Sequence, residues 1–277
     1  MTPTELLTLL RCSHCGGALS GRSCTLCGTD FPANAAGQMD MRPRATLTRN
    51  VPFAVDASDP LWSPRPEDAD EGIAPQPLDL STLIPPAPAG GAQALEIGCG
   101  HNSLRTLIER AGWTYVSVDY RSDIADALAD VHALPFADGT FPLVACNALL
   151  EHVRYPHLAA REIARVAASG GRVVGGVAFL QPFHDSYFHL THAAVRDLFA
   201  GAGLTVTALG RIPERFLPYL AVYSNLPFPF NTLVRILITP ADLVHTLLLK
   251  LKQRIKKRRD DGSIALAAAI IFAATKN

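Results

Sequence analysis

Short apolar runs alternate with helix-like stretches in the part of the chain that follows residue 91. The apolar runs predict strands at 92–97, 114–119, 142–148, 172–179, 204–212 and 264–273. The stretches between them predict helices at 103–111, 156–167 and 193–202. Such alternation is typical of βαβ units, so we expect an α/β fold with a mainly parallel, doubly wound sheet.

The chain before residue 91 shows no such alternation. Residues 1–45 contain paired cysteines and many small residues but few large apolar ones, so this module needs a metal to fold. Residues 46–90 are rich in proline and predict a linker that is partly draped over the next domain. We therefore expect three parts: a small module at 1–45, a linker at 46–90 and a main domain at 91–277.

Composition and charge restrict the number of domains, the location and the membrane association that the sequence allows. A chain of 277 residues with 48% hydrophobic content can bury one full-size core and carry a small accessory module. The formal net charge is +0, but residues 250–259 contain seven basic side chains and no acid, so the remainder is acidic. The first residues lack the pattern of a signal peptide, which predicts a cytoplasmic location. No apolar segment is both long and unbroken enough to predict a membrane span.

The first predicted strand runs into a glycine-rich turn, Glu96-Ile97-Gly98-Cys99-Gly100, and then into a helix that Asn102 or Ser103 could cap. Glycines let the backbone approach a ligand closely, but nicotinamide, flavin and other nucleotide sites share such turns. Asp119 ends the next strand, where a carboxylate can accept both ribose hydroxyls of an adenosine ligand. Together the two features predict a nucleoside site.

The pattern Glu96-x-Gly98-x-Gly100 resembles the first motif of class I S-adenosylmethionine-dependent methyltransferases, and residues 130–153 closely resemble their adenine-binding loop and fourth strand. The resemblance extends over residues 92–212 and implies their Rossmann-like, seven-stranded sheet. Asn102 departs from the family pattern, which has glycine there, although asparagine tolerates positive φ better than other non-glycine residues. A nicotinamide site would instead want glycine at Ser103.

Carried over position by position, the resemblance implies roles for ten residues. The methionine moiety would lie against the backbone of Gly98, Cys99 and Gly100, with Glu96 ordering its amino end, and Asp119 would hold the ribose. The adenine would lie between Asp130, Val131 and His132, and the pocket would close near the sulfonium at Asn147 and Leu149. The alternative for Glu96 and Asp119 is a strand-end carboxylate satisfied by neighbouring amides, and Cys99 and Cys146 are interpreted as small apolar fillers.

The loop after the fifth strand supplies candidates for a general base. It contains several titratable side chains in a short span: His184, Asp185, His189 and His192. This loop opens onto the carboxyl edge of the sheet, where doubly wound folds bind substrates. We take His184 as the hypothetical catalytic base, against the alternative of a surface or capping histidine, and His152 as an orienting or core residue.

Two C-x-x-C pairs lie within sixteen residues of the N-terminal module: Cys12 with Cys15 and Cys24 with Cys27. In a reducing compartment this spacing indicates a metal site, and four thiolates form a closed, tetrahedral structural zinc site, with iron as the alternative. Residues 12–41 resemble the zinc ribbons that activate RNA and protein methyltransferases, and similar ribbons that precede methyltransferase domains in bacterial chains. The resemblance implies a structural role or the docking of a protein partner.

An insertion at 213–262 precedes the last strand and is apolar first and basic afterwards. One interpretation is a lid-like helical cap over the substrate pocket. The other is peripheral contact with an anionic membrane through residues 243–259, or recognition of a lipid-linked acceptor. A nucleic-acid partner is disfavoured, because the basic run has no interleaved aromatic residues for base stacking.

These features predict transfer of a methyl group from S-adenosylmethionine to an oxygen or nitrogen of a small or lipid-linked metabolite. A second interpretation is an RNA or protein methyltransferase whose ribbon docks the macromolecule. A third is a non-catalytic scaffold that keeps only the cofactor fold.

Overall fold

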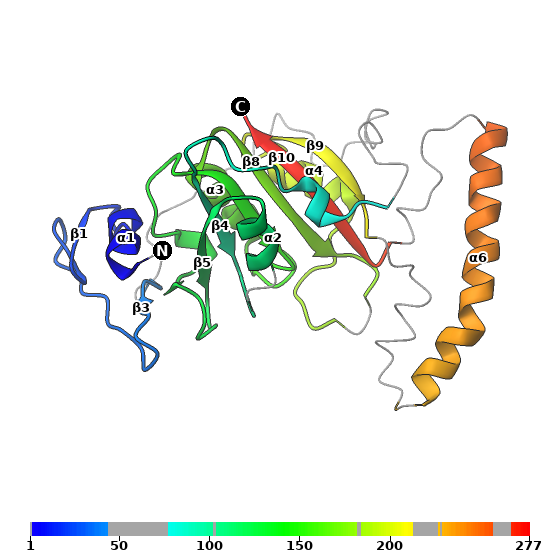
Figure 1. The fold of residues 1–277 in the computed structure, drawn as a ribbon, viewed down its shortest axis with the longest axis horizontal. Coiled ribbons are helices and arrows are strands. Elements are labelled where there is room, and N and C mark those ends of the chain that lie inside the picture. The colour runs from blue at the N-terminus through cyan, green and yellow to red at the C-terminus, as the bar shows by residue number, and fades with distance from the viewer. Residues whose placement is uncertain are drawn as a thin grey trace, which may run out of the picture.

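The computed structural model describes residues 2–43, 77–101, 104–181, 184–212, 227, 229–256 and 267–277. Its centre is an eight-stranded sheet with the strand order β3-β6-β5-β4-β7-β8-β10-β9 (Figure 1). Neighbouring strands from β3 to β8 are parallel, whereas β10 runs antiparallel to both β8 and β9. The predicted fold class, a mainly parallel α/β sheet, is confirmed.

Seven of the strands come from the predicted main domain: β4 (Gln93–Ile97), β5 (Thr114–Asp119), β6 (Ala127–Leu128), β7 (Phe141–Asn147), β8 (Ala167–Ala178), β9 (Leu204–Arg211) and β10 (Ala269–Lys276). The sequence did not predict β6, because a strand of two residues has no recognisable period. The predicted end of the last strand at residue 273 is wrong, since pairing with β8 continues to Thr275 and pairing with β9 to Lys276.

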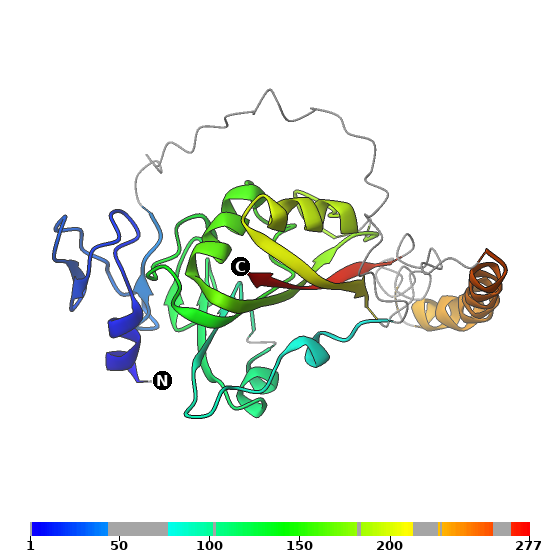
Figure 2. The ribbon, with the colours of Figure 1, turned by 90° about the horizontal axis from the view of Figure 1, so that it is seen from above.

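Helices cover both faces of this sheet (Figure 2). One face packs against α3 (Pro156–Val166) and α4 (His192–Ala200), where Ile163 and Phe199 are fully buried. The other packs against α2 (Arg105–Arg110) and the 3-10 helix η2 (Leu80–Leu83). Leu83 and Ile84 are buried in this second layer, so the described end of the predicted linker lies against the main domain.

The N-terminal module joins the same sheet. Helix α1 (Pro3–Leu9) begins with a capping box, in which Thr2 and Glu5 each bond the other's backbone amide. The short strands β1 (Leu19–Ser20) and β2 (Ser23–Cys24) form an antiparallel pair, and β3 (Met39–Asp40) pairs in parallel with β6. The module therefore adds an eighth strand to the seven of the main domain.

Part of the predicted insertion forms the long helix α6 (Phe230–Lys256), which continues through Pro240. Figures 1 and 2 both show α6 apart from the sheet, at the end opposite the N-terminal module. No helix in the described ranges is long and apolar enough to cross a membrane. Residues 213–226 and 257–262 of the insertion, like Asn102 and Ser103, lie outside the described residues.

Candidate functional site

The turn after β4 brings the chain back against the end of β5. Gly98 has a φ of 72° and donates its amide hydrogen to the Val118 carbonyl at 2.8 Å. A Cβ at Gly98 would lie 2.8 Å from Cδ1 of Leu149, so a larger residue would have to displace the Leu149 side chain as well as adopt a positive φ. Gly100, with a φ of 52°, is exposed and has open space where a Cβ would be. The structure thus places Gly98 against Leu149, while the roles of Gly98, Gly100 and Leu149 toward a cofactor stay predictions.

Asp119 organises the two loops at this edge of the sheet. Its Oδ2 accepts the Gly100 amide at 3.0 Å, and its Oδ1 accepts the amides of Arg121 and Ser122 at 2.8 and 2.9 Å. The carboxylate therefore accepts hydrogen bonds from neighbouring amides, as expected for a structural carboxylate at the end of a strand. Each carboxylate oxygen has two acceptor sites, so Oδ2 keeps one acceptor position beside the glycine turn.

The predicted adenine-binding residues form a compact turn after β6. Asp130 caps the 3-10 helix η3 (Val131–Ala133), and its Oδ1 bonds both the amide and Nδ1 of His132, at 2.9 and 2.6 Å. Burial opposes ionisation of Asp130, but the two bonds to His132 outweigh it and lower the pKa of the carboxyl. The His132 ring also packs edge-on against Tyr155, with ring centroids 5.9 Å apart.

A buried ion pair fixes the rest of this loop to α3. Oε2 of Glu162 accepts the Leu134 amide at 2.9 Å. Arg165 bonds the carbonyls of Leu134 and Phe136 at 2.9 and 2.7 Å, and its Nε lies 2.7 Å from Glu162 Oε1. Sequence reasoning did not single out Glu162 or Arg165, because nothing in a helix sequence shows which loop its polar side chains reach.

Strained backbone marks the end of β7, between the two predicted pocket residues Asn147 and Leu149. Ala148 has a φ of 51°, and no other non-glycine residue in the described part of the chain has a positive φ. Its amide bonds the Gly176 carbonyl at 2.9 Å, which holds the turn against β8. Residues kept in this region cost roughly 1–3 kcal/mol each and concentrate at functional sites.

Glu96 and the two cysteines of the main domain are buried. The Tyr115 hydroxyl donates to Glu96 Oε2, so this carboxylate bonds a side chain of the neighbouring strand. Burial raises the pKa of both the Cys99 and the Cys146 thiols to about 12. Thiols that stay protonated at neutral pH are poor nucleophiles, which agrees with the interpretation of Cys99 and Cys146 as apolar fillers.

The predicted base, His184, lies beside two residues of the turn after β7. Its Nε2 is 3.0 Å from Nε2 of His152, and a carboxylate oxygen of Glu151 completes a group whose ligand atoms lie within 4.8 Å of one another. Burial, followed by the neighbouring His152, lowers the pKa of His184. Asp185 and His189 are exposed, whereas His192 begins α4. Sequence reasoning missed Glu151, although its position next to His152 was a usable signal.

The four N-terminal cysteines converge as predicted. Sγ atoms of Cys12 and Cys27 lie 3.6 Å apart, those of Cys15 and Cys24 lie 3.5 Å apart, and all four lie within 4.8 Å of one another. Four thiolates around one zinc ion at about 2.3 Å would be about 3.8 Å apart. A Cβ at Gly17 would lie 3.0 Å from Cys24 Sγ, so the chain leaves room for the sulfurs only because this residue is glycine. The cluster fits a tetrahedral ion.

The N-terminal module contacts the same loops that carry the predicted cofactor residues. The Arg11 amide bonds the Pro135 carbonyl at 2.7 Å, in the loop after η3. Nε2 of Gln38 bonds the Ser122 carbonyl at 3.0 Å, and Nη1 of Arg42 bonds the Tyr120 carbonyl at 3.0 Å. The module therefore braces both the Asp119 loop and the adenine loop from one side.

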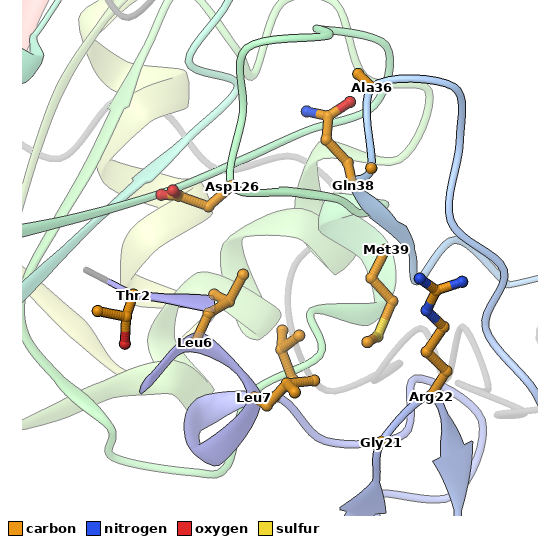
Figure 3. Close-up of a pocket in the computed structure, with 11 residues that line it drawn as sticks. Thr2, Leu6, Leu7, Gly21, Arg22, Ala36, Gln38, Met39 and Asp126 are labelled. Carbon is orange, nitrogen blue, oxygen red and sulfur yellow. The ribbon is translucent and has the colours of Figure 1, made fainter. Parts of the chain in front are cut away.

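A cavity of about 430 Å³ lies in the same N-terminal region (Figure 3). Leu6 and Leu7 of α1 and Met39 of β3 supply apolar lining, and Arg22 and Asp126 line it as well. This cavity does not include any of the predicted cofactor residues or the His152–His184 pair.

Residues 95–175 match the family described as methyltransferase domain. An uncharacterized methyltransferase from Mycobacterium sp. (strain KMS) is 30% identical over 167 residues, which are 54% of this chain and 65% of that protein. The ubiquinone biosynthesis O-methyltransferase of Ralstonia nicotianae (strain ATCC BAA-1114 / GMI1000) is 30% identical over 114 residues, 35% of this chain and 48% of that enzyme. The chain thus spans less than two thirds of the length of these relatives.

Among solved structures, the chain is similar to geranyl diphosphate C-methyltransferase from Streptomyces coelicolor A3(2). The TM-score is 0.47 and the sequence identity 15%, and the match covers 70% of this chain and 75% of that one.

Proposed function

We propose that the chain transfers a methyl group from S-adenosylmethionine to an oxygen or nitrogen of a small or lipid-linked metabolite, because residues 95–175 match the family described as methyltransferase domain. The observation that carries this proposal is the junction of Gly100 and Asp119 at the carboxyl edge of the sheet, beside the Asp130 turn. Ligands of doubly wound folds bind at this edge.

The residues present fit the cofactor. The open, glycine-lined turn at Gly98 and Gly100 would take the methionine moiety, with Cys99 contributing backbone and Glu96 ordering the amino end. Oδ2 of Asp119 accepts one hydrogen bond from the Gly100 amide and has room for a second. This second position would accept a ribose hydroxyl. The turn formed by Asp130, Val131 and His132 would flank the adenine, and Asn147 and Leu149 would close the pocket.

Bound S-adenosylmethionine supplies a methyl group that its positively charged sulfur already activates for displacement, leaving S-adenosylhomocysteine with the electron pair. The protein's part is to align the acceptor, exclude water and receive the acceptor's proton. His184 lies on the acceptor side of the edge, in the loop after β8. We expect His184→Ala to slow turnover without changing the affinity for S-adenosylmethionine, and unchanged turnover would remove His184 from the mechanism.

A lipid-linked acceptor is supported by helix α6 and by one relative. Nine apolar side chains among those that the structure describes in α6 are exposed, and at 3.6 residues per turn they form a broad stripe on one side of the helix: Phe230, Leu233, Ile236, Leu237, Leu243, Val244, Leu247, Leu248 and Leu251. The basic run at 250–259 follows the stripe. A helix of this kind lies in a membrane interface, with its apolar side buried and its bases near anionic headgroups. The similar Ralstonia enzyme is named for ubiquinone biosynthesis.

We propose zinc as the ion of the cysteine cluster at Cys12, Cys15, Cys24 and Cys27. Amides of Leu26 and Cys27 approach Cys24 Sγ at 3.4 and 3.5 Å, which stabilises negative charge on the sulfur. Four thiolates without an open position make a structural site rather than a catalytic one. Zinc would thus hold the module in the shape that braces the cofactor loops.

The test of the proposed function is transfer of isotope-labelled methyl. The full chain is incubated with methyl-labelled S-adenosylmethionine and anionic vesicles that contain a bacterial lipid extract. Label is expected to enter the lipid phase or a small-molecule fraction with the wild type and not with Asp119→Ala. No transfer to any fraction, by folded protein that binds the cofactor, would contradict the proposal.

A further inference from the structure

We propose that Glu151, His152 and His184 form a second metal site, which binds a divalent transition-metal ion such as Zn²⁺. Each residue offers one ligand atom, and the three atoms lie within 4.8 Å of one another. The site is separate from the cysteine cluster, since its ligands come from the turn after β7 and the loop after β8. The metal site itself stands on the geometry alone, whereas its use in methyl transfer rests on the proposed function.

The two histidines are spaced as ligands of one ion. Their Nε2 atoms are 3.0 Å apart, and the ring planes are inclined by 56°. Two imidazole nitrogens bound at about 2.1 Å would be about 3.4 Å apart on a tetrahedral ion and about 3.0 Å apart on an ion whose ligands meet at right angles, so the observed distance lies at the short end of this range. A single hydrogen bond between neutral rings would give the same distance between the nitrogens. The choice between this hydrogen bond and a shared metal ion therefore depends on Glu151.

Glu151 supplies that third observation. Its side chain is 1% exposed, and Oε1 accepts the Ala178 amide at 2.9 Å. Oε2 is buried and has no hydrogen-bond partner within the part of the chain that the structure describes. An unpaired buried carboxylate oxygen is costly, and a cation held jointly with His152 and His184 would remove that cost.

The backbone fixes the two halves of the site against each other. The Glu151 carbonyl accepts the amides of Tyr187 and Phe188 at 2.9 and 3.1 Å, so the loop that carries His184 is tied to the turn that carries His152. The His184 amide bonds the Gln181 carbonyl at 2.9 Å. The ligands therefore come from short, anchored segments, which keeps the ordering cost of binding an ion small.

The ligand set selects the class of ion. Two imidazoles and one carboxylate suit Zn²⁺ and other divalent transition metals, whereas Ca²⁺ and Mg²⁺ prefer oxygen ligands only. Three protein ligands leave a coordination position open, as in catalytic rather than structural zinc sites. His152 is exposed and His184 half-buried, so the open position would be accessible from solvent.

This assignment gives His184 a role as a ligand rather than as a free base. A Lewis-acidic ion lowers the pKa of a bound hydroxyl, so a hydroxyl-bearing acceptor could lose its proton to solvent near neutral pH. Glu151 follows Leu149 by two positions in the chain, so the metal site lies at the same edge of the sheet as the predicted cofactor residues. Under the proposed function, the metal therefore favours oxygen over nitrogen as the methyl acceptor.

The experiment is a calorimetric titration of the metal-free full chain with Zn²⁺. The wild type is expected to bind two equivalents, a tight one at the four cysteines and a weaker one at the second site. Glu151→Gln keeps an oxygen for the Ala178 amide but removes the charge, and it should lower the affinity of the weaker equivalent at least tenfold. His184→Ala should do the same, while His157→Ala, an exposed histidine of α3, should retain both equivalents.

One equivalent in the wild type, or a second equivalent that survives both ligand variants, would overturn the assignment. His152→Ala changes an exposed side chain and so provides a test in case Glu151→Gln does not fold. The number of bound ions is measured without S-adenosylmethionine. A failure of the proposed methyl transfer would therefore leave the ion count unchanged, and the two failures are distinguishable.

Discussion

Gly17 leaves the space that lets the four cysteine sulfurs approach one another. A side chain there would approach Leu26 Cβ at 2.9 Å and two sulfurs at 3.0 and 3.3 Å. We expect Gly17→Ala to weaken zinc binding by about tenfold or more, because the sulfurs would have to move apart. Competition with a chromophoric chelator measures this, and Ser20→Ala, an exposed change in the same module, should leave the affinity unchanged. Equal zinc affinity in both variants would contradict the packing of Gly17 against the cluster.

The sequence was informative where the chemistry of a residue is set by its neighbours in the chain. The glycine turn, Asp119 at the strand end, the C-x-x-C pairs and His184 all follow from local patterns. The structure confirms that the four cysteines converge, while the roles of Asp119 and His184 stay predictions. Glu151 was missed because its importance depends on burial and on His184, which lies 33 positions further along the chain. The Tyr115–Glu96 bond likewise depends on the register of β4 against β5, which no local pattern specifies.

At the scale of elements, α3 holds the loop that follows the predicted adenine-binding residues, and it does so through Arg165. This side chain bonds two carbonyls of the adenine loop and lies 2.8 Å from Asp138 Oδ1. Arg165→Met keeps the apolar stem but removes the cation beside the buried Glu162 carboxylate, which then keeps the Leu134 amide but no longer the charge of Arg165. We expect the free energy of unfolding to fall by about 3 kcal/mol, as measured by urea denaturation.

The matched control for this change is Arg161→Met, on the exposed side of the same helix. It should alter the free energy of unfolding by no more than about 0.5 kcal/mol. Similar values for the two variants would show that the Glu162–Arg165 pair does not hold the loop.

Helix α6 carries a prediction about membranes. Cosedimentation with phosphatidylglycerol vesicles is expected for the wild type and should weaken by about thirtyfold in Leu247→Asp, since burying a leucine contributes about 2 kcal/mol. Asn231→Asp adds the same charge on the side of the helix opposite Leu247 and should weaken binding much less. Binding that does not depend on anionic lipid, or that Leu247→Asp leaves unchanged, would exclude the membrane role of α6.

The hydrophobic periods of strands and helices predicted most elements of the main domain. They did not predict the two short strands β3 and β6, where the N-terminal module meets the main domain. β3 and β6 contain two residues each, and they pair only because the N-terminal module lies against the main domain. The insertion was expected to contain helix from its apolar character, yet its placement away from the sheet depends on the tertiary structure (Figure 1).

At the scale of the whole molecule, hydrogen bonds of Arg11, Gln38 and Arg42 join the N-terminal module to the loops that carry the predicted cofactor residues. Removing zinc should loosen the module and with it the loops that carry Asp119 and Asp130. We expect chelation to lower the affinity for S-adenosylmethionine by about tenfold, and added zinc to restore it. Glu151→Gln should show the same loss on chelation, because the effect arises at the cysteines. An affinity that is independent of zinc would show that the module is not coupled to the cofactor site.

The central claim is that the edge formed by the glycine turn and Asp119 binds S-adenosylmethionine. Calorimetric titration of the zinc-loaded chain with S-adenosylmethionine, and separately with NADH, tests it most directly. The wild type and Asp123→Ala, an exposed change in the same loop, should bind only S-adenosylmethionine, and Asp119→Ala should lose that binding. No binding of S-adenosylmethionine by folded, zinc-loaded protein, or equal binding by Asp119→Ala, would contradict the account.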